Sequence, residues 1–221
     1  MAISEVIAVG GVAASYLAGS IPFGVLVARS RGVDIRQVGS GNTGATNVGR
    51  ALGRRWGMLV FCLDFLKGLF PVLAARFGGP RLGAGAFFEF DLPVLCALAA
   101  VLGHVFSVWL GFRGGKAGAT GLGAGAVLSW PAMLAGAAVW LVIVAVSRYV
   151  SLGTILGGVG YVVAYVVRTI VFQQASPFDR EHVAMTIFCA FVVALVVFRH
   201  KDNIKRLLAG TESKVELSRG S

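Results

Sequence analysis

The sequence is short of charged residues. Only 14% of its 221 residues are charged, whereas 57% are hydrophobic, and soluble globular domains average roughly 25% charged residues. This balance excludes a water-soluble fold of ordinary composition. Cysteine is scarce as well, and Cys62, Cys96 and Cys189 lie in separate apolar stretches without a CxxC pair. We expect them to be small buried side chains, and they indicate neither a disulfide framework nor a metal site.

Histidine and acidic residues are also few. The three histidines form no His/Cys/Glu spacing typical of a metal site, and no G-x-S-x-G motif marks a serine esterase. Ten acidic residues face 20 Lys and Arg, which gives a net charge of +10. In an apolar chain, the positive-inside bias and attraction to anionic head groups account for most of this excess. We therefore expect membrane lipids as partners, no nucleic acid, no metal and no cofactor.

Apolar blocks of roughly the length that crosses a bilayer are abundant. They run from Ile3 to Ala28, Trp56 to Phe77, Leu92 to Gly111, Ala119 to Ser147, Leu152 to Phe172, and His182 to Phe198. The fourth is too long for one crossing, and Trp130-Pro131 near its middle suits the start of a new helix. The sequence predicts an all-α integral membrane protein with seven transmembrane helices in a single domain, residues 1–221.

Arginine placement sets the expected orientation. Six arginines lie between residues 29 and 55 against Asp34 alone, and the tail from Arg199 to Arg206 is basic too. Both segments belong in the cytoplasm by the positive-inside rule. An odd number of crossings then puts the N-terminus outside and the C-terminus inside. Loops 29–55, 112–118 and 148–151 and the tail 199–221 share the cytoplasmic face in this prediction.

The segment Gly39–Arg50 is a run of small polar residues that ends in a cation, between two apolar blocks. Glycine amides and Ser, Thr and Asn side chains suit an oxyanion. The same composition is typical of a flexible connector, so composition leaves both interpretations open. Gly39-x-Gly41-x-x-Gly44 formally matches a dinucleotide fingerprint, which we discard because no strand precedes it.

Gly114-Gly115-Lys116 also favours a bound phosphate, although a positive-inside anchor explains Lys116 as well. It is no P-loop, because Ala117 stands where Ser or Thr would hold magnesium. His104, inside the third block, either faces a cavity or packs helices together.

Other polar residues have plain structural interpretations. Asp64 and Lys67 are spaced i and i+3 on the second block, which predicts an internal ion pair. Ser151 suits the N-cap of the following helix. Residues 199–208 can form a basic amphipathic helix on anionic lipid.

Three motifs, in order along the chain, resemble the signature regions of the bacterial acyl-phosphate-dependent glycerol-3-phosphate acyltransferases. They are Ser40-Gly-Asn-Thr-Gly-Ala-Thr-Asn-Val-Gly-Arg50, Gly103-His-Val-Phe-Ser-Val-Trp-Leu-Gly-Phe-Arg-Gly-Gly-Lys116, and His200-x-x-Asn203-Ile-x-Arg206-Leu-x-x-Gly210-x-Glu212. Gly19-Ser20-Ile21-Pro22-Phe23-Gly24 is similar to that family too. No histidine shows the H-x-x-x-x-D spacing of the acyl-CoA-dependent enzymes. One departure is Gly118, where the family usually has Val.

The resemblance implies a bacterial inner-membrane enzyme whose active site faces the cytoplasm. It implies transfer of a fatty acyl group from long-chain acyl phosphate to the sn-1 hydroxyl of glycerol 3-phosphate, without metal or coenzyme A. The soluble enzyme that makes acyl phosphate is then an expected partner. The family's catalytic positions fall on Ser40, Asn42, Arg50, Lys116, Ser151, His200 and Asn203. Substrate-binding positions are expected at Gly41, Thr43, Gly44, Thr46, Asn47, His104, Ser107, Gly114 and Gly115.

Acyl phosphate is already activated, so the protein needs to align the hydroxyl, neutralise phosphate charge and stabilise the oxyanion. We expect Arg50 and Lys116 to neutralise phosphate, and a substrate phosphate oxygen or His104 to take the proton. The alternative function is a small anion or phosphate-ester transporter, which the lack of a repeated motif disfavours. A CDP-alcohol phosphotransferase is disfavoured because its paired-aspartate motif is missing.

Overall fold

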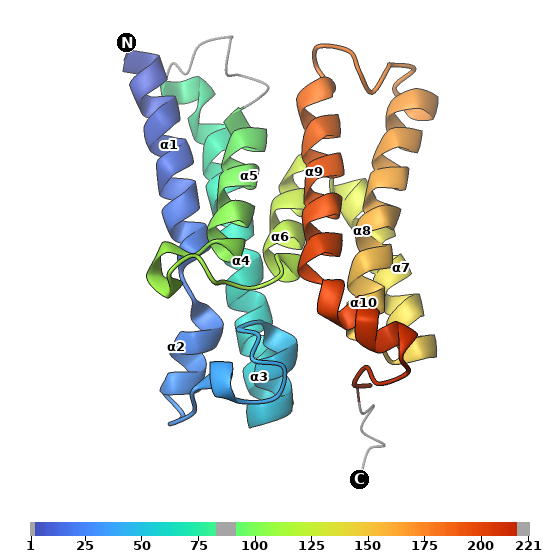
Figure 1. Cartoon of the computed structure of the whole chain (residues 1–221). Helices are drawn as coiled ribbons and strands as arrows, with labels where there is room; N and C mark the ends of the chain where they lie inside the picture. The colour runs from blue at the N-terminus through green and yellow to red at the C-terminus, as the bar shows by residue number, and fades with distance from the viewer. Residues whose placement is uncertain (1–2, 83–91, 216–221) are drawn as a thin grey trace. The chain divides into compact units, whose positions relative to one another are not determined.

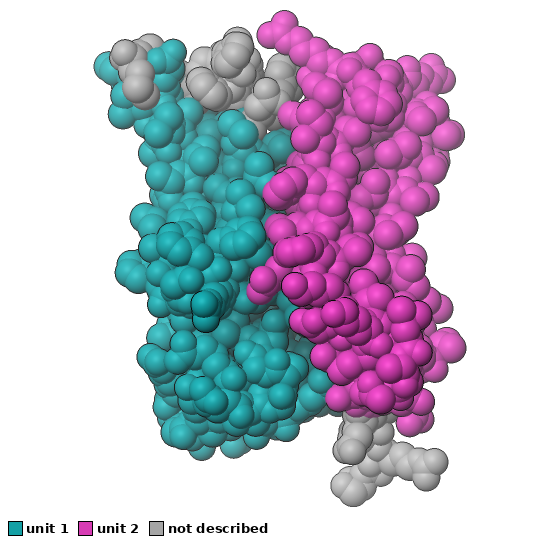
Figure 2. All heavy atoms as spheres, viewed as in Figure 1, with its two compact units in different colours: residues 1–128 teal, residues 129–221 magenta. Residues whose placement is uncertain are grey.

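The computed structural model describes residues 3–82 and 92–215, and these residues form helices and turns without a strand. They group into two compact units, residues 1–128 and 129–221, coloured teal and magenta in Figure 2. The all-α prediction is confirmed for the described residues. The single-domain organisation stays a prediction, and part of the tail 199–221 lies outside the described residues.

Five described segments are long and apolar enough to cross a bilayer: Ile3–Arg29, Arg54–Gly78, Leu92–Leu110, Trp130–Ser147 and Val150–Phe172. A sixth results if α9 (Val183–Arg199) and α10 (Lys201–Leu208), bent by 58°, count as one span. α6 (Gly118–Leu128) is a shorter apolar helix. These lengths support an integral membrane protein, and the count of seven crossings stays a prediction.

Unit 1 contains two helix breaks that the sequence did not predict. The first apolar block forms α1 (Ile3–Ser20) and α2 (Phe23–Arg29), because Pro22 has no N–H and disfavours helical geometry at Ile21. The third block forms α5 (Leu92–Val105), which ends at Val105 instead of Gly111 and is followed by a short 3₁₀ turn at Val108–Leu110. The second block is one helix as predicted, α4 (Arg54–Gly78).

The predicted loop 29–55 between the first two apolar blocks has regular structure of its own, which the sequence did not predict. The segment contains a 3₁₀ turn, Ile35–Gln37, and α3 (Ala45–Leu52). The physical reason is packing, because Ile35 and Val48 join Val25, Ala28 and Val60 in a fully buried apolar core. In Figure 1 these elements lie at the end of unit 1 opposite the N-terminus. The core fixes segment 39–50 on α4.

Small residues bring the helices of unit 1 into close contact. A Cβ at Gly19 on α1 would overlap the backbone of Ala100 on α5, and one at Gly103 would overlap Tyr16 O. A Cβ at Gly68 on α4 or at Gly123 on α6 would likewise overlap the backbone of the other helix. Small residues are typical of membrane helix interfaces, where close backbone approach replaces a hydrophobic driving force.

Unit 2 contains α7 (Trp130–Ser147), α8 (Val150–Val167), a π turn at Arg168–Phe172, α9 and α10. The predicted split of the fourth block is confirmed, since α6 ends at Leu128 and Pro131 lies in the first turn of α7. The predicted N-cap at Ser151 is wrong. α8 begins at Val150, and its N-cap position is Tyr149.

The three cysteines differ in burial. Cys96 and Cys189 are buried as predicted, but Cys62 is exposed on the surface of α4, so that prediction is wrong for Cys62. The apolar pattern did not separate the two environments, because an outward surface in lipid is as apolar as the interior.

The close packing of α1 on α5 leads to a test with a matched control. We expect Gly19→Ala to lower the free energy of unfolding in detergent by about 1–3 kcal/mol through overpacking, and so to lower the thermal midpoint. Gly10→Ala on the same helix has nothing within 4 Å of the added Cβ, so it should leave stability unchanged or raise it through helix propensity. Thermal denaturation of both variants measures this, and equal midpoints would contradict the packing assignment.

Candidate active site

Segment 39–50 has backbone conformations that favour anion binding. Gly39 and Gly41 have φ of 60° and 66°, the left-handed region that glycine adopts without strain. Asn42 Oδ1 accepts a hydrogen bond from Gly44 N at 2.8 Å, and Gly44 is the N-cap position of α3. The first amides of α3 have no partner within the helix, which makes a helix start favourable for negative charge.

Asn47 connects the whole segment. Its Oδ1 accepts from Ser40 N at 3.1 Å, and its Nδ2 donates to Ile35 O at 3.2 Å, Val38 O at 2.9 Å and Asn42 O at 3.0 Å. The side chain is only 3% exposed. Asn47 was expected to bind substrate, and in this geometry its amide shapes the loop that would do so.

The remaining predicted residues of the segment differ in exposure. Ser40, Thr46 and Arg50 are exposed, and Thr43 is buried. Arg50 lies in the last turn of α3, one turn beyond Asn47. Arg50 therefore extends from an ordered helix, which limits the positions its guanidinium can reach.

The loop before α6 is held against the end of α5. Gly114 N donates to Val105 O at 2.9 Å, and Gly115 N donates to His104 O at 3.0 Å. Both glycines are buried, while Lys116 is partly exposed. The next residue, Ala117, has a left-handed φ of 65°. Lys116 is thus presented from a tightly shaped turn.

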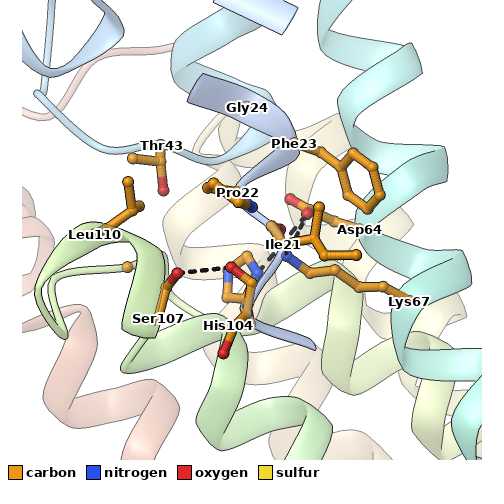
Figure 3. A pocket seen from close by; sticks show the side chains of 12 residues that line it. Ile21, Pro22, Phe23, Gly24, Thr43, Asp64, Lys67, His104, Ser107 and Leu110 are labelled. Atoms are coloured by element: carbon orange, nitrogen blue, oxygen red, sulfur yellow. Dashed lines mark hydrogen bonds and ion pairs between the residues drawn. The ribbon is translucent and has the colours of Figure 1, made fainter. Parts of the chain in front are cut away.

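A polar cavity lies behind these segments in unit 1 (Figure 3). Its volume is about 10 Å³, which at most equals the room for one water molecule. It cannot admit a phosphate ester. Its lining includes the predicted site residues Thr43, His104, Ser107 and Gly114.

The cavity lining is built from interactions between helices. Ser107 Oγ donates to Ser20 O at 2.6 Å, so this hydroxyl supports the break in α1. The predicted ion pair is confirmed, with Lys67 Nζ 2.8 Å from Asp64 Oδ1. His104 Nδ1 lies 3.8 Å from the same oxygen. His104 lines the cavity, which is one of the two alternatives that the sequence left open.

Unit 2 brings two predicted residues together around a carboxylate. Ser151 Oγ donates to Glu212 Oε1 at 2.8 Å, and Asn203 Nδ2 donates to the same oxygen at 2.6 Å. Arg206 Nε donates to Glu212 Oε2 at 2.7 Å. We call these four residues the Glu212 cluster. Ser151, Asn203 and Glu212 are each under 9% exposed.

The Glu212 cluster stabilises the ionised carboxylate. Burial alone would raise the pKa of Glu212, but hydrogen bonds from Asn203, Ser151 and Arg206, with the charge of Arg206, outweigh it. The pKa therefore lies below its ordinary value of 4.5. Glu212 is negatively charged at neutral pH and holds Ser151 and Asn203 in place.

His200 lies at the bend between α9 and α10 and is 5% exposed. Its Nδ1 is 2.7 Å from Val196 O. A carbonyl oxygen only accepts hydrogen bonds, so Nδ1 carries a proton and the ring orientation is fixed.

The sequence missed two parts of this arrangement. Glu212 stands in the third motif, yet it was not predicted to take part in the site, and its signal was an acid in a basic tail that has only two others, Asp202 and Glu216. Asp64 and Lys67 were predicted only as an ion pair, without the cavity they line. Within the described ranges, no three or more His, Cys, Asp or Glu side chains cluster as metal ligands would.

Comparison with known proteins agrees with the geometry. The family model described as glycerol-3-phosphate acyltransferase matches residues 9–210. The glycerol-3-phosphate acyltransferase of Anaeromyxobacter sp. (strain Fw109-5) is 46% identical over 210 residues, covering 93% of this chain and 95% of the relative. That of Aquifex aeolicus is 43% identical over 203 residues, with 90% and 95% covered.

A solved structure is similar over the same range. It is the crystal structure of PlsY (YgiH), an integral membrane glycerol 3-phosphate acyltransferase, in its glycerol 3-phosphate form. The identity is 40% and the TM-score 0.81, with 95% of this chain and 96% of that chain covered. On this sequence match and shared fold, the chain is an integral membrane enzyme that belongs to the glycerol-3-phosphate acyltransferase family.

Proposed function

We propose that the chain transfers a fatty acyl group from long-chain acyl phosphate to the sn-1 hydroxyl of glycerol 3-phosphate. The products are lysophosphatidic acid and inorganic phosphate, the first acylation step of bacterial phospholipid synthesis. One observation carries the proposal: two glycine-rich segments, 39–50 and 112–118, form ordered turns within the stretch that matches this family. Each segment also supplies one cation, Arg50 or Lys116.

The donor is proposed from the charge of the site. An acyl phosphate has a good leaving group that carries its own negative charge, and glycerol 3-phosphate has a second phosphate. Arg50 and Lys116 can each neutralise a phosphate, and Ser40, Asn42 and the amides at the start of α3 can complete the contacts. Asn47 and Ser107 act by shaping the two loops.

The reaction balances without further reactants. The sn-1 hydroxyl oxygen attacks the acyl carbonyl carbon, and a new ester C–O bond forms. The bond between that carbon and the phosphate oxygen breaks, and phosphate leaves with the electron pair. A phosphate oxygen of the substrate takes the hydroxyl proton, with His104 as the alternative acceptor.

Ser151, His200 and Asn203 are proposed to bind glycerol 3-phosphate. The geometry of unit 2 supports this role, because Glu212 orients Ser151 and Asn203 and Val196 O orients His200. Because these contacts already restrict the side chains, less conformational entropy would be lost when the substrate binds.

The cellular location is proposed from the predicted membrane topology. Seven crossings in a single domain, with the N-terminus outside and the tail inside, place segments 29–55, 112–118 and 148–151 in the cytoplasm. We propose the bacterial inner membrane as the location and the soluble enzyme that makes acyl phosphate as a partner.

A donor comparison tests the reaction. Purified protein given acyl phosphate and glycerol 3-phosphate should release phosphate and form lysophosphatidic acid, with or without chelator. Acyl-CoA should be a poor donor, because its reacting thioester has no phosphate attached to the acyl carbon for Arg50 and Lys116 to bind. Activity with acyl-CoA alone, or glycerol 3-phosphate flux in proteoliposomes without acyl transfer, would contradict the proposal.

Two cation variants test the site. Lys116→Ala and Arg50→Ala should each lower kcat/KM by about 10²-fold or more, as removal of a charge-stabilising donor does. Arg36→Ala is the control, because Arg36 lies in the same cytoplasmic segment but forms an exposed ion pair with Asp34, which contributes little. Near-normal transfer by folded Lys116→Ala and Arg50→Ala would refute their assignment.

The Glu212 cluster predicts a pH dependence of stability. Because the pKa of folded Glu212 is depressed, its contribution is present above 4.5 and is lost as the pH falls through the folded pKa. Glu212→Gln should therefore lower the free energy of unfolding by about 2 kcal/mol at neutral pH. Its deficit against wild type should shrink below pH 4.5, as measured by denaturation in detergent.

Asp202→Asn, an exposed acid on α10, is the control for Glu212→Gln. A deficit that stays constant across the acid range would show that the Glu212 charge is not what stabilises unit 2.

A further inference from the structure

The cavity of unit 1 contains a charged pair that burial makes costly. Asp64 is 2% exposed and Lys67 is 7% exposed. Desolvation of such ions costs several kcal/mol each, so a buried pair is weak evidence for a purely stabilising role. Well-packed apolar residues at these two positions would serve stability as well.

Lys67 connects the pair to the break between α1 and α2. Its Nζ donates to Ile21 O at 2.7 Å, just before Pro22, and lies 5.6 Å from the ring centre of Phe23. Next to this break, Gly24 packs so closely on Thr43 O that no Cβ would fit. The pair therefore supports the backbone against which segment 39–50 lies.

His104 connects Asp64 to the second glycine-rich segment. Its Nδ1 faces Asp64 Oδ1 at 3.8 Å (Figure 3). Its Nε2 lies against Gly115, where a Cβ would overlap the ring. The carbonyl of His104 accepts the Gly115 amide. The ring therefore packs directly on Gly115, so the ring position and the loop position depend on each other.

We propose that Asp64 is a positioning residue that acts through His104 on the backbone of residues 114–116 and so sets where Lys116 presents its ammonium group. Lys67 holds the Asp64 carboxylate in place through their 2.8 Å contact. The cavity is too small for a substrate, so the cluster acts through the protein backbone. This role rests on the proposed function of Lys116.

The sharpest variant removes the charges and keeps the packing. Asp64→Leu/Lys67→Met replaces the ion pair by apolar side chains of similar size, a change that buried pairs often tolerate. We expect folded protein whose unfolding midpoint is lowered because Ile21 O loses its donor, and a kcat/KM lowered 10- to 100-fold, because small misplacement of a catalytic group has effects of this size. A folded double variant with wild-type kinetics would overturn the proposal.

Amide hydrogen exchange provides a measurement independent of activity. The Gly114 and Gly115 amides bond Val105 O and His104 O, so their exchange should become at least tenfold faster in the double variant. Arg76→Gln is the control on the same helix, because Arg76 donates to Val127 O on α6 and does not line the cavity. It should change neither the exchange of residues 114–116 nor kcat/KM.

A mutant cycle tests the route through His104. If Asp64 acts through that ring, Asp64→Asn should add less than twofold to the kcat/KM loss of His104→Gln. Independent, multiplying losses would overturn the proposed route.

The two proposals fail in different ways. Wild-type protein without acyl transfer would refute the proposed function, whereas unchanged exchange at residues 114–116 in the double variant would refute the role of Asp64.

Discussion

A break in a membrane helix releases backbone carbonyl groups that the bilayer core cannot hydrate, so side chains must bond them. In unit 1, Lys67 donates to Ile21 O, Ser107 to Ser20 O, and the Tyr16 hydroxyl to Phe106 O. These bonds allow α1 and α5 to stop and irregular backbone to follow. The glycine-rich loop after α5 begins at one break, and segment 39–50 packs on the other through Gly24. The candidate site therefore depends on how the breaks are satisfied.

Glycine has two separate physical tasks in these motifs. At Gly39 and Gly41 it supplies left-handed backbone in the segment that would hold an anion. At Gly114 and Gly115 it permits contact, because a Cβ would overlap the carbonyl or ring of His104. A motif that resembles a flexible phosphate loop is thus partly a packing surface. That rigidity suits a reaction in which the donor is already activated and alignment is the main contribution of the protein.

The sequence predicted the features that local chemistry determines. Apolar blocks gave most of the helices, Trp130-Pro131 gave the break before α7, and i, i+3 spacing gave the Asp64–Lys67 pair. It did not predict α3, because this helix is short and polar and is ordered by burial of Val48 and by close contact of Gly49 with Gly57 on α4. Nor could it find the partner of Ser151, since Glu212 lies 61 residues away and only the tertiary fold brings them together.

The charge of Glu212 bears on which group of glycerol 3-phosphate the residues beside it would contact under the proposed function. Glu212 is ionised, so it repels phosphate and favours hydroxyl donors. The Asn203 amide and the Ser151 hydroxyl are groups that both donate and accept hydrogen bonds, as glycerol hydroxyls do. Arg50 and Lys116 match phosphate charge instead. Under the proposed function, the chemistry of the Glu212 cluster therefore favours hydroxyl groups over phosphate, whereas that of the two cations favours phosphate.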